Sequence, residues 1–170
     1  MKKPRIFAKQ DGVEAGDLLH CGEDHLSAAE ALFSTSPSFY DSAGYLAHMG
    51  IELLLKGWLL EAAGEFPGIH RLSELWDTLV RSHGAPALTE DESKLLTKLD
   101  QFETLRYPNR KAPTEVGSDD WEMVDAFSKK LRGLMPESIE TPVPADNLVR
   151  KSGRVLMKKK IESAGEPGDS

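Results

Sequence analysis

One stretch of the sequence, residues 36–64, is apolar around nearly its whole circumference when it is drawn as a helix. Ser36 followed by Pro37 is a start signal, because the hydroxyl can cap free N–H groups and a proline there costs no donor. Gly64 is the matching end, since glycine adopts the left-handed conformation that terminates helices. A helix that is apolar on nearly all sides has to be surrounded by other elements. We therefore predict a central helix over about residues 37–63 that the rest of the chain covers.

Three polar residues interrupt this apolar surface along one stripe. His48, Glu52 and Lys56 are spaced i, i+4 and i+8, so they lie on the same face of the helix. Charges on a buried helix are costly unless they are paired. One interpretation is a buried ion pair, with Arg106 as a candidate partner, that fixes the helix register. The other is a pocket in which Lys56 and Arg106 hold a phosphate and His48 exchanges a proton near neutral pH.

The same stretch carries small residues every seven positions, at Ala43, Gly50 and Gly57. Glycine inside a helix costs about 1 kcal/mol relative to alanine, so two glycines on one face need a reason. The pattern indicates close packing against another helix or, as the alternative, close approach of a ligand.

Four further segments show apolar residues at helical spacing, over about residues 11–33, 72–83, 90–107 and 118–134. Their limits are marked by Gly84, by a capping box from Thr89 to Glu92, by Pro108 and by a capping Ser118. No strand pattern and no internal repeat is visible. We predict an all-α fold, an antiparallel four- to five-helix up-and-down bundle.

The length of 170 residues suits one domain with a tail. We expect disorder over residues 1–10, the bundle over 11–136, and a Pro-containing linker with a basic, partly disordered tail over 137–170, in which residues 146–163 can form a short basic helix. The net charge of −7 lies entirely in residues 1–136. An acidic body argues against broad, sequence-independent binding of nucleic acid, although local basic patches stay open.

Several classes of site and location are disfavoured. No apolar run approaches the roughly 18 residues of a membrane span, and no signal peptide is visible. The single cysteine, Cys21, rules out an internal disulfide and fits a reducing compartment, so we expect a cytoplasmic protein. Cys21 and His25 are two ligands where a structural zinc site needs four. We expect no metal and no cofactor.

Three spans resemble, in order and in spacing, the HEPN domain, a small helical-bundle family named for nucleotide binding. The first is residues 47–57, with an acidic residue, apolar positions and a lysine on the central helix. The second is Gly68-Ile69-His70-Arg71-Leu72, similar to the glycine-x-histidine-x-leucine start of the next helix. The third is Leu105-Arg106-Tyr107-Pro108-Asn109, similar to an arginine-tyrosine-proline element that ends a later helix. The resemblance covers about residues 12–134.

The resemblance implies a helical bundle, often a homodimer, of a kind found in toxin–antitoxin, phage-defence and RNA-processing systems. Many members are metal-independent ribonucleases, which carry an arginine, then four to six residues, then a histidine. No histidine of this chain follows an arginine at that spacing. Arg106 begins the right element, but the downstream positions hold Lys111, Ala112 and Pro113. The chain is thus identified as a variant without the ribonuclease motif, and we expect no catalytic residues.

The predicted ligand-binding residues are His48, Glu52, Lys56, His70, Arg106 and Tyr107. His70 precedes a helix start, where free N–H groups favour an anion; the alternative is a loop-to-helix hydrogen bond. We expect Tyr107 to pack its ring under the end of the bundle. Arg110 and Lys111 extend a basic edge beyond Arg106, which a solvated loop explains equally well.

Three functions stay open from the sequence. The chain is a non-catalytic binding module for a nucleotide, RNA or a partner protein, a degenerate ribonuclease toxin, or a homodimerising structural partner of a nucleotidyltransferase-like protein. The missing arginine–histidine spacing favours the first and the third.

Overall fold

The computed structural model describes residues 4–107, 109–139, 148–151 and 154–157. Within them the chain forms five α-helices, α1 (Ala15–Thr35), α2 (Tyr40–Ala63), α3 (Leu72–His83), α4 (Glu90–Phe102) and α5 (Asp119–Leu134). Short 3₁₀ helices precede or follow them, η1 (Lys9–Asp11), η2 (Pro37–Phe39) and η3 (Glu103–Arg106). The predicted all-α helical bundle is confirmed.

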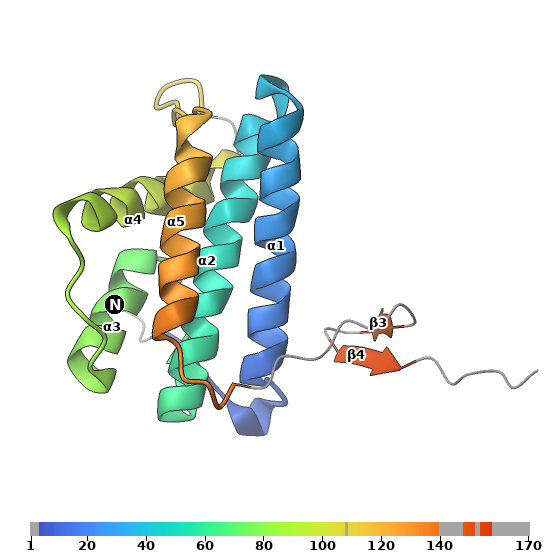
Figure 1. Ribbon diagram of the computed structural model, residues 1–170, viewed down its shortest axis with the longest axis vertical. Helices are drawn as coiled ribbons and strands as arrows, with labels where there is room; N and C mark the ends of the chain where they lie inside the picture. The colour runs from blue at the N-terminus through green and yellow to red at the C-terminus, as the bar shows by residue number, and fades with distance from the viewer. Residues whose placement is uncertain (1–3, 108, 140–147, 152–153, 158–170) are drawn as a thin grey trace, which may run out of the picture.

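The long helices surround α2, as its apolar circumference predicts. Figure 1 shows α1, α2 and α5 side by side, with α3 and α4 on the far side of α2 and α4 lying across the bundle. α2 contacts all four other α-helices, and its most extensive contact is with α1. Its largest fully buried apolar side chains are Ile51, Leu54, Leu55, Leu59 and Leu60. None of the helices in the described ranges is long and apolar enough to cross a bilayer.

The two ends of α2 follow the predicted signals with one adjustment. The Ser36 hydroxyl accepts a hydrogen bond from the Ser38 N–H at 3.3 Å, but this cap opens η2, and α2 proper begins at Tyr40. Gly64 ends α2 with φ of 76°, in the left-handed region that glycine adopts without strain.

The seam between α1 and α2 explains the small residues of the central helix. A Cβ atom added to Gly50 would lie 2.6 Å from Leu26 Cγ and 3.0 Å from the Gly22 carbonyl oxygen. A Cβ atom added to Gly57 would lie 2.1 Å from Leu19 Cδ1. These distances are below van der Waals contact, so the glycines let two helix backbones approach closely. The interpretation as helix packing is confirmed.

Two short antiparallel sheets correct the expectation that the chain has no strands. β1 (Ile6–Ala8) pairs with β2 (Glu65–Pro67), so part of the segment expected to be disordered is ordered. Strands of three residues are too short to show a period of two, and their pairing joins distant parts of the chain. The Phe7 and Phe66 rings stack at 5.4 Å across this sheet.

The tail differs from the basic helix expected over residues 146–163. β3 (Leu148–Lys151) pairs with β4 (Arg154–Met157) in an antiparallel register. The intervening Ser-Gly dipeptide is typical of turns, and this is the signal that the helical interpretation overlooked. At the start of the predicted linker, the Ser138 hydroxyl donates to Glu61 Oε1 at 2.9 Å and Ile139 packs against the core. The remaining parts of the predicted linker and tail lie outside the described residues.

Local helix caps were predicted with mixed success. At the start of α4, Thr89 N–H donates to Glu92 Oε2 at 2.8 Å and Glu92 N–H donates to Thr89 Oγ1 at 3.3 Å, as the capping box requires. At α5, Asp120 rather than Ser118 accepts the loop N–H, that of Gly117, at 2.8 Å. The Ser118 hydroxyl contacts Asp119 instead.

Candidate functional site

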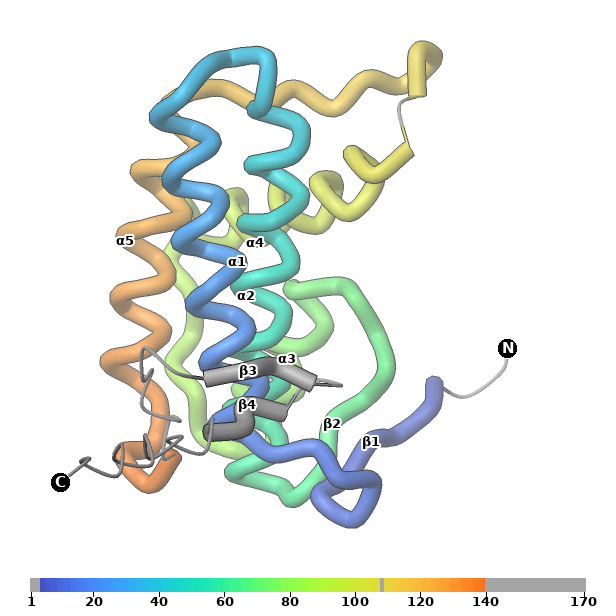
Figure 2. Tube along the Cα trace, turned by 90° about the vertical axis from the view of Figure 1, so that its right-hand side faces the viewer, coloured from blue at the N-terminus to red at the C-terminus, as the bar shows by residue number. Residues whose placement is uncertain are grey.

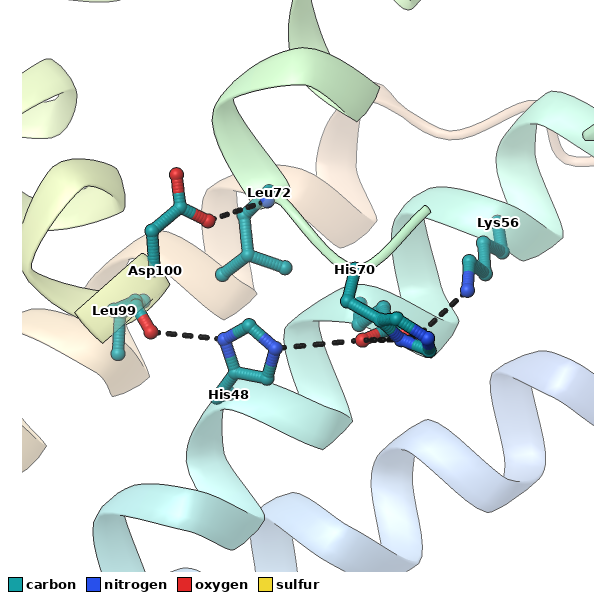
Figure 3. Close-up of polar contacts among 7 residues, drawn as sticks. His48, Lys56, His70, Leu72, Leu99 and Asp100 are labelled. Carbon is teal, nitrogen blue, oxygen red and sulfur yellow. Dashed lines mark hydrogen bonds and ion pairs between the residues drawn. The ribbon is translucent and has the colours of Figure 1, made fainter. Parts of the chain in front are cut away.

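Glu52, on the buried face of α2, contacts three basic side chains, those of His48, Lys56 and His70 (Figure 3). Lys56 Nζ donates to Glu52 Oε1 at 2.5 Å, one helical turn away. His70, from the segment between β2 and α3, places Nδ1 at 3.1 and 3.2 Å from the two carboxylate oxygens. His48 Nε2 lies 3.4 Å from Glu52 Oε2. The i, i+4 spacing therefore assembles an ion-pair cluster. The closest partner of Glu52 in this cluster is Lys56, not Arg106.

His48 connects this cluster to α4. Its side chain is 0% exposed, and its Nδ1 lies 2.8 Å from the Leu99 carbonyl oxygen. A carbonyl oxygen only accepts, so Nδ1 must donate. The other ring nitrogen, Nε2, lies 3.4 Å from Glu52 Oε2, which is within ion-pair distance but forms no hydrogen bond among the described residues.

The surroundings of Glu52 favour its ionised state. Burial pushes its pKa upward, since a charge is poorly solvated inside the bundle. Contacts with His48 and Lys56 push the pKa downward, and so do the positive charges of Lys56 and His70. The downward contributions prevail, and the pKa of Glu52 falls from 4.5 to about 2. Glu52 is therefore a carboxylate at neutral pH.

A carboxylate from α4 completes a closed circuit of polar contacts, which we call the polar ring. Asp100 accepts from the Leu72 N–H and from the Ser73 hydroxyl, each at 2.6 Å, and so caps the N-terminus of α3. The circuit runs from Glu52 to His70, along the chain to Leu72, across to Asp100 and Leu99, and back through His48 (Figure 3). Sequence reasoning missed Asp100, because the residues that it caps lie on another helix.

The polar ring accounts for His70. The anion that the free N–H groups of α3 were expected to attract is the protein's own Asp100 carboxylate. His70 instead contacts Glu52, and its side chain is 57% exposed. His48, Glu52 and Lys56 are at most 6% exposed. Within the cluster, His70 is the residue that solvent reaches.

Arg106 and Tyr107 lie apart from this cluster, at the end of η3. Among the described residues no ion pair joins Arg106 to Glu52, whose partners are Lys56, His48 and His70. The Arg106 guanidinium carbon instead lies 5.0 Å from the centre of the Tyr107 ring. The expected packing of Tyr107 under the bundle is wrong, since the residue is 70% exposed. The inward positions are taken by Phe102 and by Leu105, which pack against α2.

The chain around Tyr107 forms a hollow with a volume of about 750 Å³, which we call the basic hollow. Its lining residues are Glu103, Thr104, Arg106, Tyr107, Asn109, Arg110 and Lys111. The lining thus combines three cations, one exposed aromatic ring and one carboxylate. Such a combination suits a phosphate and a stacked base. The described part of the chain contains no group of three His, Cys, Asp or Glu residues that could hold a metal ion.

Comparison with known proteins gives a family assignment. A family model described as "HEPN domain" matches residues 15–135. The matched span contains all five α-helices, the Glu52 cluster and the basic hollow. No curated protein and no solved structure matches the chain.

Proposed function

The chain belongs to the HEPN domain family, and on this basis we propose that it is a non-catalytic binding module that recognises a nucleotide or RNA through the basic hollow. The observation that carries the proposal is the Arg106–Tyr107 pair, a cation over an aromatic ring that is 70% exposed, with Arg110 and Lys111 in the same lining. Toxin–antitoxin or defence systems are the setting that the family suggests.

The chemistry of the basic hollow supports this ligand class. Arginine and lysine side chains neutralise phosphates, and the planar arginine fork can bind two phosphate oxygens at once. A base stacked on an exposed tyrosine contributes about 1–3 kcal/mol without regard to sequence. Glu103 is the one carboxylate in the lining, so repulsion of a polyanion is small.

The lining also favours binding over cleavage. None of its residues is a histidine, and the positions that carry the catalytic histidine in ribonuclease members hold Lys111, Ala112 and Pro113. The buried cluster offers no substitute, because His48 is 0% exposed and already contacts Leu99 and Glu52. In this proposal His48, Glu52 and Lys56 hold the bundle together and the ligand contacts come from the η3 end.

The test is a titration of a fluorescein-labelled, mixed-sequence RNA of twelve nucleotides, followed by fluorescence anisotropy at several salt concentrations. The double variant Arg110→Ala with Lys111→Ala should weaken binding at least tenfold and reduce the salt slope by about 1.4 for two lost phosphate contacts. Tyr107→Ala should weaken binding by about five- to a hundredfold. The matched control is Lys129→Ala, which removes an exposed lysine on α5 that pairs with Asp125.

Two results would overturn the proposal. Equal affinities for wild type, the double variant and the control would mean that the basic hollow is not the binding surface. Metal-independent cleavage of the RNA that Arg106→Ala abolishes would establish the degenerate ribonuclease toxin instead.

A second candidate function is structural, as a homodimer or as the partner of a nucleotidyltransferase-like protein. The observation that favours it is the set of exposed large apolar residues, Ile6, Phe39, Tyr107 and Met123. Sedimentation equilibrium of the purified chain tests the homodimer, and a monomer at all concentrations would contradict it.

A further inference from the structure

A second hollow, which we call the polar hollow, borders the basic hollow. Its volume is about 640 Å³, and it lies between the start of α3, the second half of α4 and residues 109–114. Its lining includes the polar side chains of Arg71, Thr97, Gln101, Thr104, Asn109 and Thr114. Thr104 and Asn109 also line the basic hollow, so the two hollows meet at these residues.

One side-chain contact joins the two sides of the wall between the hollows. The hydroxyl oxygens of Thr104 and Thr114 lie 3.2 Å apart, within hydrogen-bonding distance, which ties the segment after η3 back onto it. This segment runs along one end of the bundle, the end opposite β1 and β2 (Figure 2). Each hollow has a volume within the range of about 300–1,000 Å³ in which compact organic ligands bind. Two adjacent monomer units of one linear polymeric ligand can therefore occupy the two hollows at the same time.

The charges of the polar hollow suit a polyanion at its edge. The Arg71 side chain is 70% exposed, and its ion-pair contact with Glu74 is long, at 3.8 Å. The carboxylate in the lining, Asp100, is already bonded to the Leu72 N–H and the Ser73 hydroxyl. Arg71 therefore presents an available cation on the side of the polar hollow formed by the start of α3.

The inner groups of the polar hollow match hydroxyl groups better than charges. The Thr97 hydroxyl donates to the Ser93 carbonyl oxygen, which leaves its own oxygen atom as an acceptor. The Thr104 hydroxyl donates to the Gln101 carbonyl oxygen, so its oxygen accepts from the Thr114 hydroxyl and keeps one lone pair for a ligand. Asn109 Oδ1 accepts from the Lys111 N–H at 3.0 Å, which leaves its NH₂ group to donate. The hydroxyl groups of a ribose both donate and accept hydrogen bonds, so a ribose requires neutral acceptors and donors of this kind.

We infer that the two hollows bind successive nucleotides of one single-stranded RNA, with a base stacked on Tyr107 in the basic hollow, a ribose in the polar hollow and a phosphate at Arg71. This inference rests on the proposed function and narrows its ligand from a nucleotide to a strand. Arg71 and Gln101 become ligand contacts, and neither was among the ligand-binding residues predicted from the sequence.

The test compares three probes, a fluorescein-labelled RNA octamer of uridine, the DNA octamer of deoxyuridine and unlabelled UMP as a competitor. Wild type should bind the RNA octamer at least tenfold tighter than UMP and severalfold tighter than the DNA. Arg71→Ala should weaken the RNA octamer by roughly tenfold, the effect of one charge-assisted hydrogen bond, and leave competition by UMP unchanged. Gln101→Ala should reduce the preference for RNA over DNA. Unchanged thermal melting would verify that both variants fold.

The outcomes separate the inference from the function beneath it. Arg110→Ala that weakens the octamer while Arg71→Ala leaves it within twofold of wild type would overturn the strand and keep the proposed function. Equal affinity for RNA and DNA would remove the ribose from the polar hollow, and equal affinity for UMP and the octamer would reduce the ligand to a mononucleotide. If neither Arg71→Ala nor Arg110→Ala changes the affinity for the RNA octamer, the proposed function is overturned as well.

Discussion

A single carboxylate, Glu52, is shared by three basic side chains, which makes its charge the most consequential one inside the bundle. Lys56 comes from the same helix, whereas His70 comes from the segment before α3 and His48 also contacts α4 through Leu99. Removing this carboxylate would leave buried positive charge, and removing one base would leave a partly paired carboxylate. The two changes therefore test different things.

The first prediction concerns pH. The pKa of Glu52 in the folded chain is about 2, below its ordinary 4.5, so its contribution to stability is complete above pH about 4.5 and is lost as the pH falls toward 2. The shift corresponds to about 3 kcal/mol in the free energy of unfolding. Urea unfolding between pH 5 and 2 should show a flatter pH dependence for Glu52→Gln than for wild type. Glu90→Gln, an exposed carboxylate beside Lys94, is the control and should retain the wild-type slope.

The second prediction separates structure from binding within the same cluster. Lys56→Met should lower the free energy of unfolding by about 3 kcal/mol, because it leaves Glu52 short of its closest partner. Adding Glu52→Gln should recover part of that loss, since no unpaired carboxylate then remains. Affinity for the RNA should equal that of wild type in the double variant. A stable double variant that no longer binds RNA would show that the cluster belongs to the ligand site.

At the scale of the element, the seam between α1 and α2 depends on the absence of side chains. Gly50→Ala gains about 1 kcal/mol in helix propensity, but its Cβ would meet Leu26 Cγ at 2.6 Å and the Gly22 carbonyl oxygen at 3.0 Å. Backbone cannot yield as a side-chain tip can, so we expect a net loss of about 1–3 kcal/mol in the free energy of unfolding. The control is Gly133→Ala on α5, where a Cβ would meet nothing within 4 Å. That change should be neutral or slightly stabilising in the same urea titration.

The helices were predictable because their signals are local, and the parts that escaped prediction are contacts over long sequence distances. The Thr89–Glu92 box and the Gly64 end are read within a few residues. The β1–β2 pairing and the cap of α3 by Asp100 join segments whose own sequences carry no sign of the partner. For the site, the i, i+4 spacing was enough to place Lys56 and His48 each within ion-pair distance of Glu52. That Arg106 faces solvent depends on how η3 packs, which periodicity does not determine.

At the scale of the whole molecule, the acidic body and the basic hollow impose opposite demands on a polyanion. The net charge of −7 repels RNA at long range, while the cations near η3 attract it locally. Binding should therefore be confined to that end of the bundle.

The next prediction concerns the N-terminal strand. Deletion of residues 1–10 removes β1 and uncovers Phe66, whose ring stacks on Phe7 and also lies 5.6 Å from Lys56 Nζ. We expect a lower melting temperature but unchanged affinity for RNA, because β1 lies at the end of the bundle opposite η3 (Figure 2), and η3 contributes to the lining of the basic hollow. Circular dichroism melting and the anisotropy titration measure the two effects. A deletion without effect on melting would mean that β1 contributes nothing to the stability of the bundle.

The polar ring has a consequence for the speed of unfolding. Its contacts join residues 18, 28 and 51 positions apart, so they can form only after α2, α3 and α4 have come together. Interactions that are absent from the folding transition state slow escape from the native state and leave the rate of folding almost unchanged. In stopped-flow kinetics, Glu52→Gln should therefore raise the unfolding rate constant and leave the folding rate constant almost unchanged. The polar ring would thus lower the rate of unfolding. The loop that carries His70 and Arg71 would then stay in its native position until the whole bundle unfolds.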